Sequence, residues 1–425
     1  MEGSQSRQSA IRNPQSAIGK SAIRNLRSAI GEFLGLRANV VALLAAIVFI
    51  GSGEELWIRF VPRYLEVLGA GTLVIGFYDG LKTLLGAVYA YPGGILTDRW
   101  GHRRALSFFT ILSIAGYLLV LAIPHWAAVL GGTFLFLAWT SFSLPATFSL
   151  VGTSLAPEKY GMGIPLQSMI KRIPILIGPI LGGILIDRFG LLAGMRLGLL
   201  ASAILGLVAL LVQNRISESE PVAAQTRGLR LGFAVAQFQP ELRRLLLSDI
   251  LIRFCERIPA AWVVILVMSH LGFSAKQFGY LTALEVGVAM LCFIPAAWLS
   301  DRYGREPFVI LTFVFFTLFP LVLLRAQTPF WLIVAFAIRG LKEFGEPARK
   351  ALIIHYSSGS NQGQLIGAYY LIRDLTVTPG ALLGAWLWSA GPEINFWGAF
   401  VFGLLGTAGY AWTLARSDLR LTIDD

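Results

Sequence analysis

Charged side chains inside long apolar runs are the residues of this sequence whose types and spacing could do chemistry. On insertion scales, each Lys or Arg at the centre of a membrane helix costs about 2.5–3.5 kcal/mol, so ten would cost about 25–35 kcal/mol. Folded proteins are stable by only ~5–15 kcal/mol, so most of these cations must be paired or hydrated. The ten cations are Arg59, Lys82, Lys171, Arg172, Arg196, Arg253, Arg257, Arg339, Lys342 and Arg373.

Acids stand close to several of these cations at helical spacing. Glu55 and Arg59 are four residues apart, so they would share one face of a helix. Arg373 stands beside Asp374, and adjacent residues point to different faces. The further pairs that this spacing predicts are Asp79 with Lys82, Arg253 with Glu256, Arg339 with Glu343, and Lys342 with Glu346.

A carboxyl inside a membrane can release and rebind a proton as its surroundings change. Burial raises the pKa of a carboxyl and a neighbouring arginine lowers it, so a cavity that opens and closes changes both influences. The alternative is that these charges form static ion pairs that hold the protein together. The candidates for binding a proton or a substrate are Glu54, Glu55, Arg59, Glu256, Arg257, Arg339, Glu343, Arg373 and Asp374.

The high share of hydrophobic residues and the low share of charged residues indicate a membrane protein. Of its 425 residues, 56% are hydrophobic and 14% are charged, against about 25% charged in soluble proteins. Mean hydropathy is +0.68. These values exclude a soluble globular enzyme, a disordered or fibrous chain and a small disulfide-linked domain. The net charge of +11 is spread over the breaks between apolar runs, which indicates loops against an anionic membrane face and no nucleic-acid partner.

Long apolar runs alternate with short polar breaks from Ala38 onward. Each run could cross ~30 Å of hydrocarbon, and runs of this length without period-2 alternation predict helices. We therefore expect an all-α polytopic membrane protein with twelve transmembrane helices. Their centres are residues 38–65, 72–97, 104–123, 127–153, 162–187, 191–213, 245–269, 275–299, 307–325, 329–353, 364–388 and 394–415.

The polar segments divide the chain into parts. Residues 9–20 and 21–32 are a tandem duplication without an apolar core, so residues 1–36 are a disordered repeat tail or follow from a start assigned too far upstream. The expected parts after this tail are an N-terminal six-helix bundle (37–213), a cytoplasmic linker (214–244) with a surface helix in 231–243, a C-terminal six-helix bundle (245–416) and a tail (417–425).

The two halves repeat each other in the same order and direction. At an offset of 203 residues, Asp98, Arg99 and Gly101 fall on Asp301, Arg302 and Gly304. Parallel repeats of this kind build alternating-access transporters, with the binding site between the halves near the middle of the bilayer. Lys and Arg are concentrated in the loops on the side of both termini, which predicts cytoplasmic termini in an inner or plasma membrane.

The loop between the second and third spans has a recognisable spacing. Its glycines allow a tight turn, and its basic cluster favours the cytoplasmic face. It closely resembles the signature loop of the major facilitator superfamily, and a second copy, at Asp301, Arg302 and Gly304, joins the eighth and ninth spans. In that family the loop latches the cytoplasmic gate. The matching residues of the first copy are Gly94, Asp98, Arg99, Gly101, Arg103 and Arg104.

A glycine- and proline-rich segment lies in the fifth span, at Gly178, Pro179, Gly182 and Gly183. Proline removes a backbone hydrogen bond, and paired glycines permit bending and close packing. The segment resembles one that is typical of the family's proton-coupled exporters, although Pro174 stands where they have an earlier glycine. Packing by small residues, with no bearing on transport direction, is the alternative.

The resemblance implies a secondary active transporter and no enzyme. It also implies that the first, fourth, seventh and tenth helices line a central cavity, whose charge here lies mostly in the C-terminal half. We expect proton-coupled efflux of small organic molecules by a functional monomer in the lipid bilayer, with the proton as coupling ion and no cofactor or metal. The alternative is uptake or facilitated transport of a polar or anionic metabolite, which would satisfy the arginines.

Overall fold

The computed structural model describes most of the chain, and every regular element in the described ranges is a helix. These ranges are residues 38–154, 160–216, 235–358 and 362–421. The tail at 1–36 and most of the linker therefore lie outside the described residues. The backbone alone is described at residues 38–40, 90, 91, 94, 98, 142–154, 160–169 and 416–421.

The N-terminal half contains six spans, as the sequence predicts. The first span is divided: helix α2 ends at Glu54, and the chain continues through a 3-10 turn. The other five are single helices. The elements are α2 (Ala38–Glu54), η1 (Ile58–Phe60), α3 (Val61–Val67), α4 (Thr72–Trp100), α5 (His102–Ala122), α6 (Trp126–Ser154), α7 (Tyr160–Phe189) and α8 (Leu191–Gln213).

The C-terminal half contains six further spans, of which the first, fourth and fifth are divided. Of the predicted surface helix in 231–243, the described residues include a short helical stretch at 235–236, and α10 begins separately at Pro240 and continues into the seventh span. The elements are α10 (Pro240–Arg257), α11 (Trp262–Ile265), the π-helical turn η3 (Leu266–His270), α12 (Ala275–Tyr303), α13 (Glu306–Arg325), α14 (Pro329–Leu341), α15 (Glu346–Tyr356), α16 (Gln362–Val377), α17 (Gly380–Ala390) and α18 (Pro392–Leu421).

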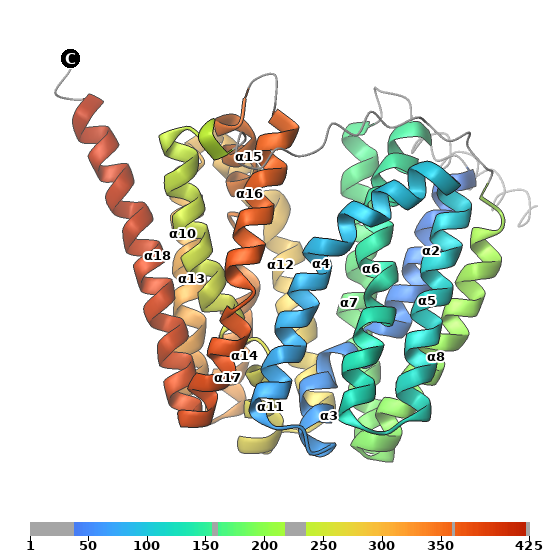
Figure 1. The fold of residues 1–425 in the computed structure, drawn as a ribbon. Helices are drawn as coiled ribbons and strands as arrows, with labels where there is room; N and C mark the ends of the chain where they lie inside the picture. Colours follow the sequence, from blue (N-terminus) through green and yellow to red (C-terminus); the bar gives the residue numbers. More distant parts are fainter. Residues whose placement is uncertain (1–37, 155–159, 217–234, 359–361, 422–425) are drawn as a thin grey trace, which may run out of the picture.

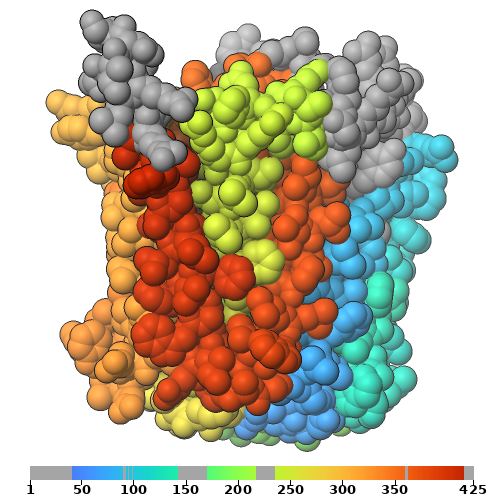
Figure 2. Space-filling model, turned by 60° about the vertical axis from the view of Figure 1, so that its left-hand side comes forward, coloured from blue at the N-terminus to red at the C-terminus, as the bar shows by residue number. Residues whose placement is uncertain are grey.

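The surface of this bundle is apolar. By length and composition alone, six of the described helical segments are long and apolar enough to cross a membrane. The other spans are divided by breaks, carry several charges, or are described only in part. Figure 2 shows one outer face, formed by α18, α10 and the neighbouring α16 and α17. Large apolar side chains on these helices, including Leu247, Leu375, Trp386, Leu405 and Trp412, are more than half exposed, as expected of a face that contacts lipid.

The two halves lie side by side and meet at one end (Figure 1). There α3 packs on α11, α4 on α17 and α7 on α12. We call this the closed end; its turns carry Gly69, Gly190, Gly272 and Gly391, each at positive φ. The ribbons diverge toward the opposite end, where α4 turns into α5 and α12 into α13.

The glycine- and proline-rich segment lies very close to neighbouring backbone. A Cβ on Gly182 would collide with the backbone carbonyl of Leu56, and one on Gly183 with the backbone of Ala275 in the other half. Helix α7 runs through Pro179 without a break. In this conformation the segment serves close packing, both within the N-terminal half and against α12.

The internal repeat is visible in the backbone. Helices α2 and α10 end at Glu54 and Arg257, which are 203 residues apart. The glycine turns Gly101 and Gly304, at φ 79° and 90°, have the same offset. Only glycine adopts this conformation without strain, so the repeated glycines fix repeated turns. The halves therefore share the break in their first span and the glycine turn after their second, which agrees with the two-bundle fold predicted from sequence.

Candidate functional site

A cavity of about 340 Å³ lies between the two halves. Apolar side chains of both halves, such as Ile58 and Phe278, form part of its wall. The remainder is unusually charged for a membrane interior. Its charged lining residues are Glu55, Arg59, Asp79 and Lys82 of the N-terminal half and Glu256, Arg257, Glu285, Arg339 and Lys342 of the C-terminal half.

Helix breaks bring several of these charges to the cavity. Glu55 follows the end of α2, and Arg59 lies in η1. Arg257 is the last residue of α10, and Lys342 follows the end of α14. Irregular backbone at membrane depth is tolerated where it is buried in protein or lines a cavity. The breaks therefore place charged side chains where water or a substrate can reach them.

The N-terminal lining charges form two of the predicted pairs. Arg59 Nε lies 3.2 Å from Glu55 Oε2, and Lys82 Nζ lies 3.0 Å from Asp79 Oδ1. Asp79 also faces the other half, because Arg257 Nη1 lies 3.6 Å from its Oδ2. Asp79, which is 3% exposed, is thus shared between a lysine of its own helix and an arginine of the opposite half.

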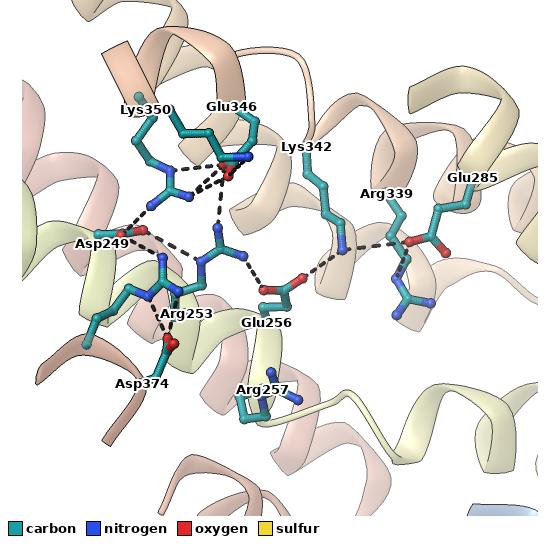
Figure 3. A network of polar contacts seen from close by, with 12 residues as sticks. Asp249, Arg253, Glu256, Arg257, Glu285, Arg339, Lys342, Glu346, Lys350 and Asp374 are labelled. Atoms are coloured by element: carbon teal, nitrogen blue, oxygen red, sulfur yellow. Dashed lines mark hydrogen bonds and ion pairs between the residues drawn. The ribbon is translucent and has the colours of Figure 1, made fainter. Parts of the chain in front are cut away.

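The C-terminal lining charges form a chain of pairs (Figure 3). Arg253 and Lys342 both donate to Glu256, at 2.7 and 2.8 Å. Lys342 also lies 3.7 Å from Glu285, which Arg339 approaches to 3.4 Å. The cavity side of this half is therefore a continuous network of alternating charge.

Two predicted pairs are wrong. Arg339 pairs with Glu285 and not with Glu343, and Lys342 pairs with Glu256 and Glu285 and not with Glu346. The physical reason is the end of α14 at Leu341, because the i,i+4 rule holds only where the helix continues. Glu343 instead lies 3.5 Å from Arg172 of the other half.

A second network lies within the C-terminal half, next to the cavity. Asp249 is fully buried and accepts hydrogen bonds from Arg349 and, at 3.0 Å, from the Tyr369 hydroxyl. Arg349 also donates to both oxygens of Glu346, at 2.7 and 2.8 Å. The sequence analysis did not single out Asp249, although Asp249 stands four residues before Arg253 in an apolar run.

Arg373 and Asp374 belong to this second network and not to the cavity lining. The guanidinium of Arg373 lies 2.7 Å from Asp374 Oδ1 although adjacent residues point to different helix faces, because the arginine side chain is long enough to bend toward its neighbour. Arg373 Nη1 also lies 3.5 Å from Asp249. Both residues are thus held by neighbours within one half.

Glu54 differs from the other candidate acids. Its side chain is 9% exposed, and the hydroxyl of Thr140 in α6 donates to its Oε2 at 2.9 Å. Within the described residues, no Lys, Arg or His nitrogen lies within 4 Å of this carboxyl. Glu54 is a buried carboxyl whose one described side-chain partner is neutral.

The signature loops lie at the end where the halves diverge. Gly101 and Gly304 form the turns, Arg99 lies in the last turn of α4, and Arg103 and Arg104 lie in the first turn of α5. The backbone alone is described at Gly94 and Asp98. In the second copy, Asp301 is exposed and lies 3.8 Å from Arg305, while Arg302 stacks over the Trp298 ring at 5.6 Å. These described contacts stay within one half.

The described side chains include no group of three or more His, Cys, Asp or Glu residues placed to hold a metal ion. Two six-helix halves around a charged central cavity instead define a membrane transporter. A model of the Major Facilitator Superfamily matches residues 17–255 and 245–421, and the chain belongs to this family of transporters.

Individual relatives are distant. The chain is 24% identical over 365 residues to the multidrug resistance protein MdtH of Yersinia pestis (strain Pestoides F), covering 83% of this chain and 88% of the relative. A crystal structure of the nucleoside transporter NupG has a TM-score of 0.74 at 11% identity, covering 88% of this chain and 98% of that one. An inward-facing bacterial homologue of the iron transporter ferroportin has a TM-score of 0.68 at 16% identity, covering 88% and 97%. These likenesses in structure show the shared fold.

Proposed function

We propose that this chain is a proton-coupled exporter of small organic molecules that works by alternating access. The observation that carries the proposal is Glu54, a buried carboxyl that is hydrogen-bonded to the neutral Thr140 beside a cavity of paired charges. The cavity lies within a single chain, so a monomer suffices. In this proposal the termini and the diverging end face the cytoplasm, and the closed end faces outward.

The environment of Glu54 suits a proton carrier. Burying an ionised carboxylate without a cationic partner costs far more than burying a neutral acid, so such a group takes up a proton when it is sealed from water. Every acid that lines the cavity lies within 4 Å of a cation and is stabilised in its charged form. Exposure of Glu54 to the two sides in turn would then move one proton per cycle.

Export is favoured over uptake by two likenesses. The relative MdtH is described as a multidrug resistance protein. The segment at Gly178–Gly183 has the spacing that is typical of proton-coupled exporters, and its glycines pack directly against the Glu55–Leu56 backbone. This contact places the Gly178–Gly183 segment directly against the residues that follow Glu54.

Transport of a polar or anionic metabolite is the second candidate, and the cavity itself favours it. Five cations and four acids line the wall, so the lining carries a net positive charge. Arg59 and Arg257 come from opposite halves, and an arginine has five N–H donors in a planar fork suited to a carboxylate. One structural neighbour is described as a human organic anion transporter, at 15% identity and a TM-score of 0.61.

Proton movement in proteoliposomes tests the proposal. A pH dye inside the vesicles is followed while cationic drugs, neutral drugs or small organic anions are added to wild-type protein. The Glu54→Gln variant keeps a hydrogen-bond acceptor for Thr140 but cannot ionise, so we expect it to bind solutes without moving protons. The matched control is Glu393→Gln, because Glu393 is an exposed acid at the start of α18. Solute-driven proton flux that persists in Glu54→Gln would overturn the role of Glu54.

A further inference from the structure

The carboxylate of Asp187, near the end of α7, caps a helix of the opposite half. The backbone N–H groups of Ala275 and Lys276 donate to Asp187 Oδ1 and Oδ2, at 2.9 and 3.1 Å. These are the first two amides of α12, at the closed end. The contact therefore joins the N-terminal half to the C-terminal half on the face opposite the signature loops.

Helix α12 is otherwise capped by its own residues. Ser274 accepts a hydrogen bond from the Gln277 N–H, and the Gln277 side chain accepts one from the Ser274 N–H. This capping box leaves the amides of Ala275 and Lys276 without a partner inside the helix. Asp187 supplies that partner, so the first turn of α12 is complete only while the two halves are together at this end.

The sequence around Asp187 repeats the spacing of the signature loop. Gly183, Asp187, Arg188 and Gly190 have the intervals of Gly94, Asp98, Arg99 and Gly101. Gly190 forms its turn at φ 82°, close to the 79° of Gly101. The chain thus carries this pattern at the closed end as well as at the opposite end.

Pseudo-symmetry places a weaker contact at the equivalent position. Ser389 is the residue of the second half that corresponds to Asp187, at an offset of 202. Ala275, at the start of α12, corresponds in the same way to Thr72, at an offset of 203. The hydroxyls of Thr72 and Ser389 lie 2.7 Å apart across the halves. The equivalent position therefore joins the halves through two side-chain hydroxyls, whereas Asp187 bonds directly to backbone amides of the opposite half.

We propose that Asp187 is an outer latch, which holds the closed end shut by capping α12 and is released when that end opens. An anionic side chain at a helix N-terminus is stabilised both by the free amides and by the helix dipole. Separation of α7 from α12 breaks both hydrogen bonds and returns two amides to water. The latch rests on alternating access, as in the proposed function, but it requires neither proton coupling nor any particular substrate.

The test measures how often the closed end opens. In a Cys255→Ser, Cys292→Ser background, Ala260→Cys places one thiol on the cavity wall. A membrane-impermeant maleimide added on the outer side reaches this thiol only through the closed end. Because the labelling rate follows the population of the open form, we expect Asp187→Ala to raise the rate roughly 2- to 10-fold.

Three further variants make the result specific. Asp187→Asn keeps an oxygen acceptor and loses the charge, so its rate should fall between wild type and Asp187→Ala. Ser389→Ala should give a smaller rise, and Glu393→Ala should give none, since Glu393 lies in the first turn of α18 and not between the halves. Melting temperature in detergent identifies any variant that fails to fold. A labelling rate in folded Asp187→Ala and Asp187→Asn equal to that of wild type would overturn the latch, whatever the proton-flux assay shows.

Discussion

Glu66 and Ser269 occupy the same position in the two halves, 203 residues apart, and they are hydrogen-bonded to each other. The Ser269 hydroxyl donates to Glu66 Oε2 at 3.0 Å. Equivalent residues of a two-fold repeat touch each other only at the axis that relates the halves. The pseudo-two-fold axis therefore passes between these side chains at the closed end. When one half rotates against the other, contacts at this axis move least. The Glu66–Ser269 contact can therefore stay in place while contacts farther from the axis break.

Gly182→Ala tests the close packing of α7. A Cβ at this position would overlap the carbonyl group of Leu56, because the carbonyl carbon would lie only 2.7 Å from that Cβ. Backbone atoms cannot move aside as a flexible side chain can. We expect a loss of at least about 1–3 kcal/mol in stability, seen as a lower melting temperature in detergent. Gly86→Ala in α4 is the control, because its Cβ would meet nothing within 4 Å and alanine favours helix by about 1 kcal/mol. Equal melting temperatures for the two variants would contradict this packing.

Asp249→Asn tests the buried network of the C-terminal half. It leaves the buried Arg349 with Glu346 as its carboxylate partner and also removes a carboxylate that faces Arg373; loss of one partner from a buried pair costs up to about 3–5 kcal/mol. The double variant Asp249→Leu, Arg349→Met removes both charges and should recover part of the melting temperature. Glu343→Gln breaks a pair whose side chains are more than a quarter exposed, so a change of only about 0–1 kcal/mol is expected. A double variant less stable than Asp249→Asn would argue against this account.

Sequence reasoning predicted much of the fold, because lipid permits few solutions. Apolar run lengths gave all twelve spans, and the repeated glycine turns gave the two halves. The breaks after Glu54, Arg257 and Leu341 were not predicted, since the apolar pattern continues across them. Those breaks decide which cation meets which acid, and so the pairs of Arg339 and Lys342 were wrong while Arg59 with Glu55 was right.

The candidate site was predicted in part for the same reason. Five of the nine candidate residues line the cavity: Glu55, Arg59, Glu256, Arg257 and Arg339. The lining residues Asp79 and Glu285 were left out, because spacing along one helix cannot report contacts with another: Asp79 meets Arg257 of the opposite half, and Glu285 meets Arg339 from a neighbouring helix. Asp187 was missed too, although its Gly-x-x-x-Asp-Arg-x-Gly spacing was there to be read.

Deletion of residues 2–34 tests the terminal duplication. The segment lies outside the described residues and has no apolar core, and the first span begins only at Ala38. We expect membrane insertion and solute-driven proton flux to equal those of the full chain. Membrane fractionation and the vesicle assay measure the two properties. Loss of either would give the duplication a function in targeting or transport.

Arg257→Gln distinguishes the two candidate substrate classes. Asp79 is buried but keeps Lys82 at 3.0 Å when the more distant Arg257, at 3.6 Å, is removed, so the variant should still fold. Hydrogen bonds to a charged group are worth about 1.5–3 kcal/mol, and an anionic substrate that binds Arg257 should therefore bind roughly 10- to 100-fold more weakly. A cationic drug should bind equally well or better, because the cavity loses a positive charge.

Binding constants for one organic anion and one cationic drug, measured by tryptophan fluorescence, decide between these outcomes. Arg63→Gln is the control, since Arg63 pairs with Glu66 and does not line the cavity. If Arg257→Gln leaves anion affinity unchanged, the guanidinium is a structural partner of Asp79, and the exporter of uncharged or cationic molecules is the better description.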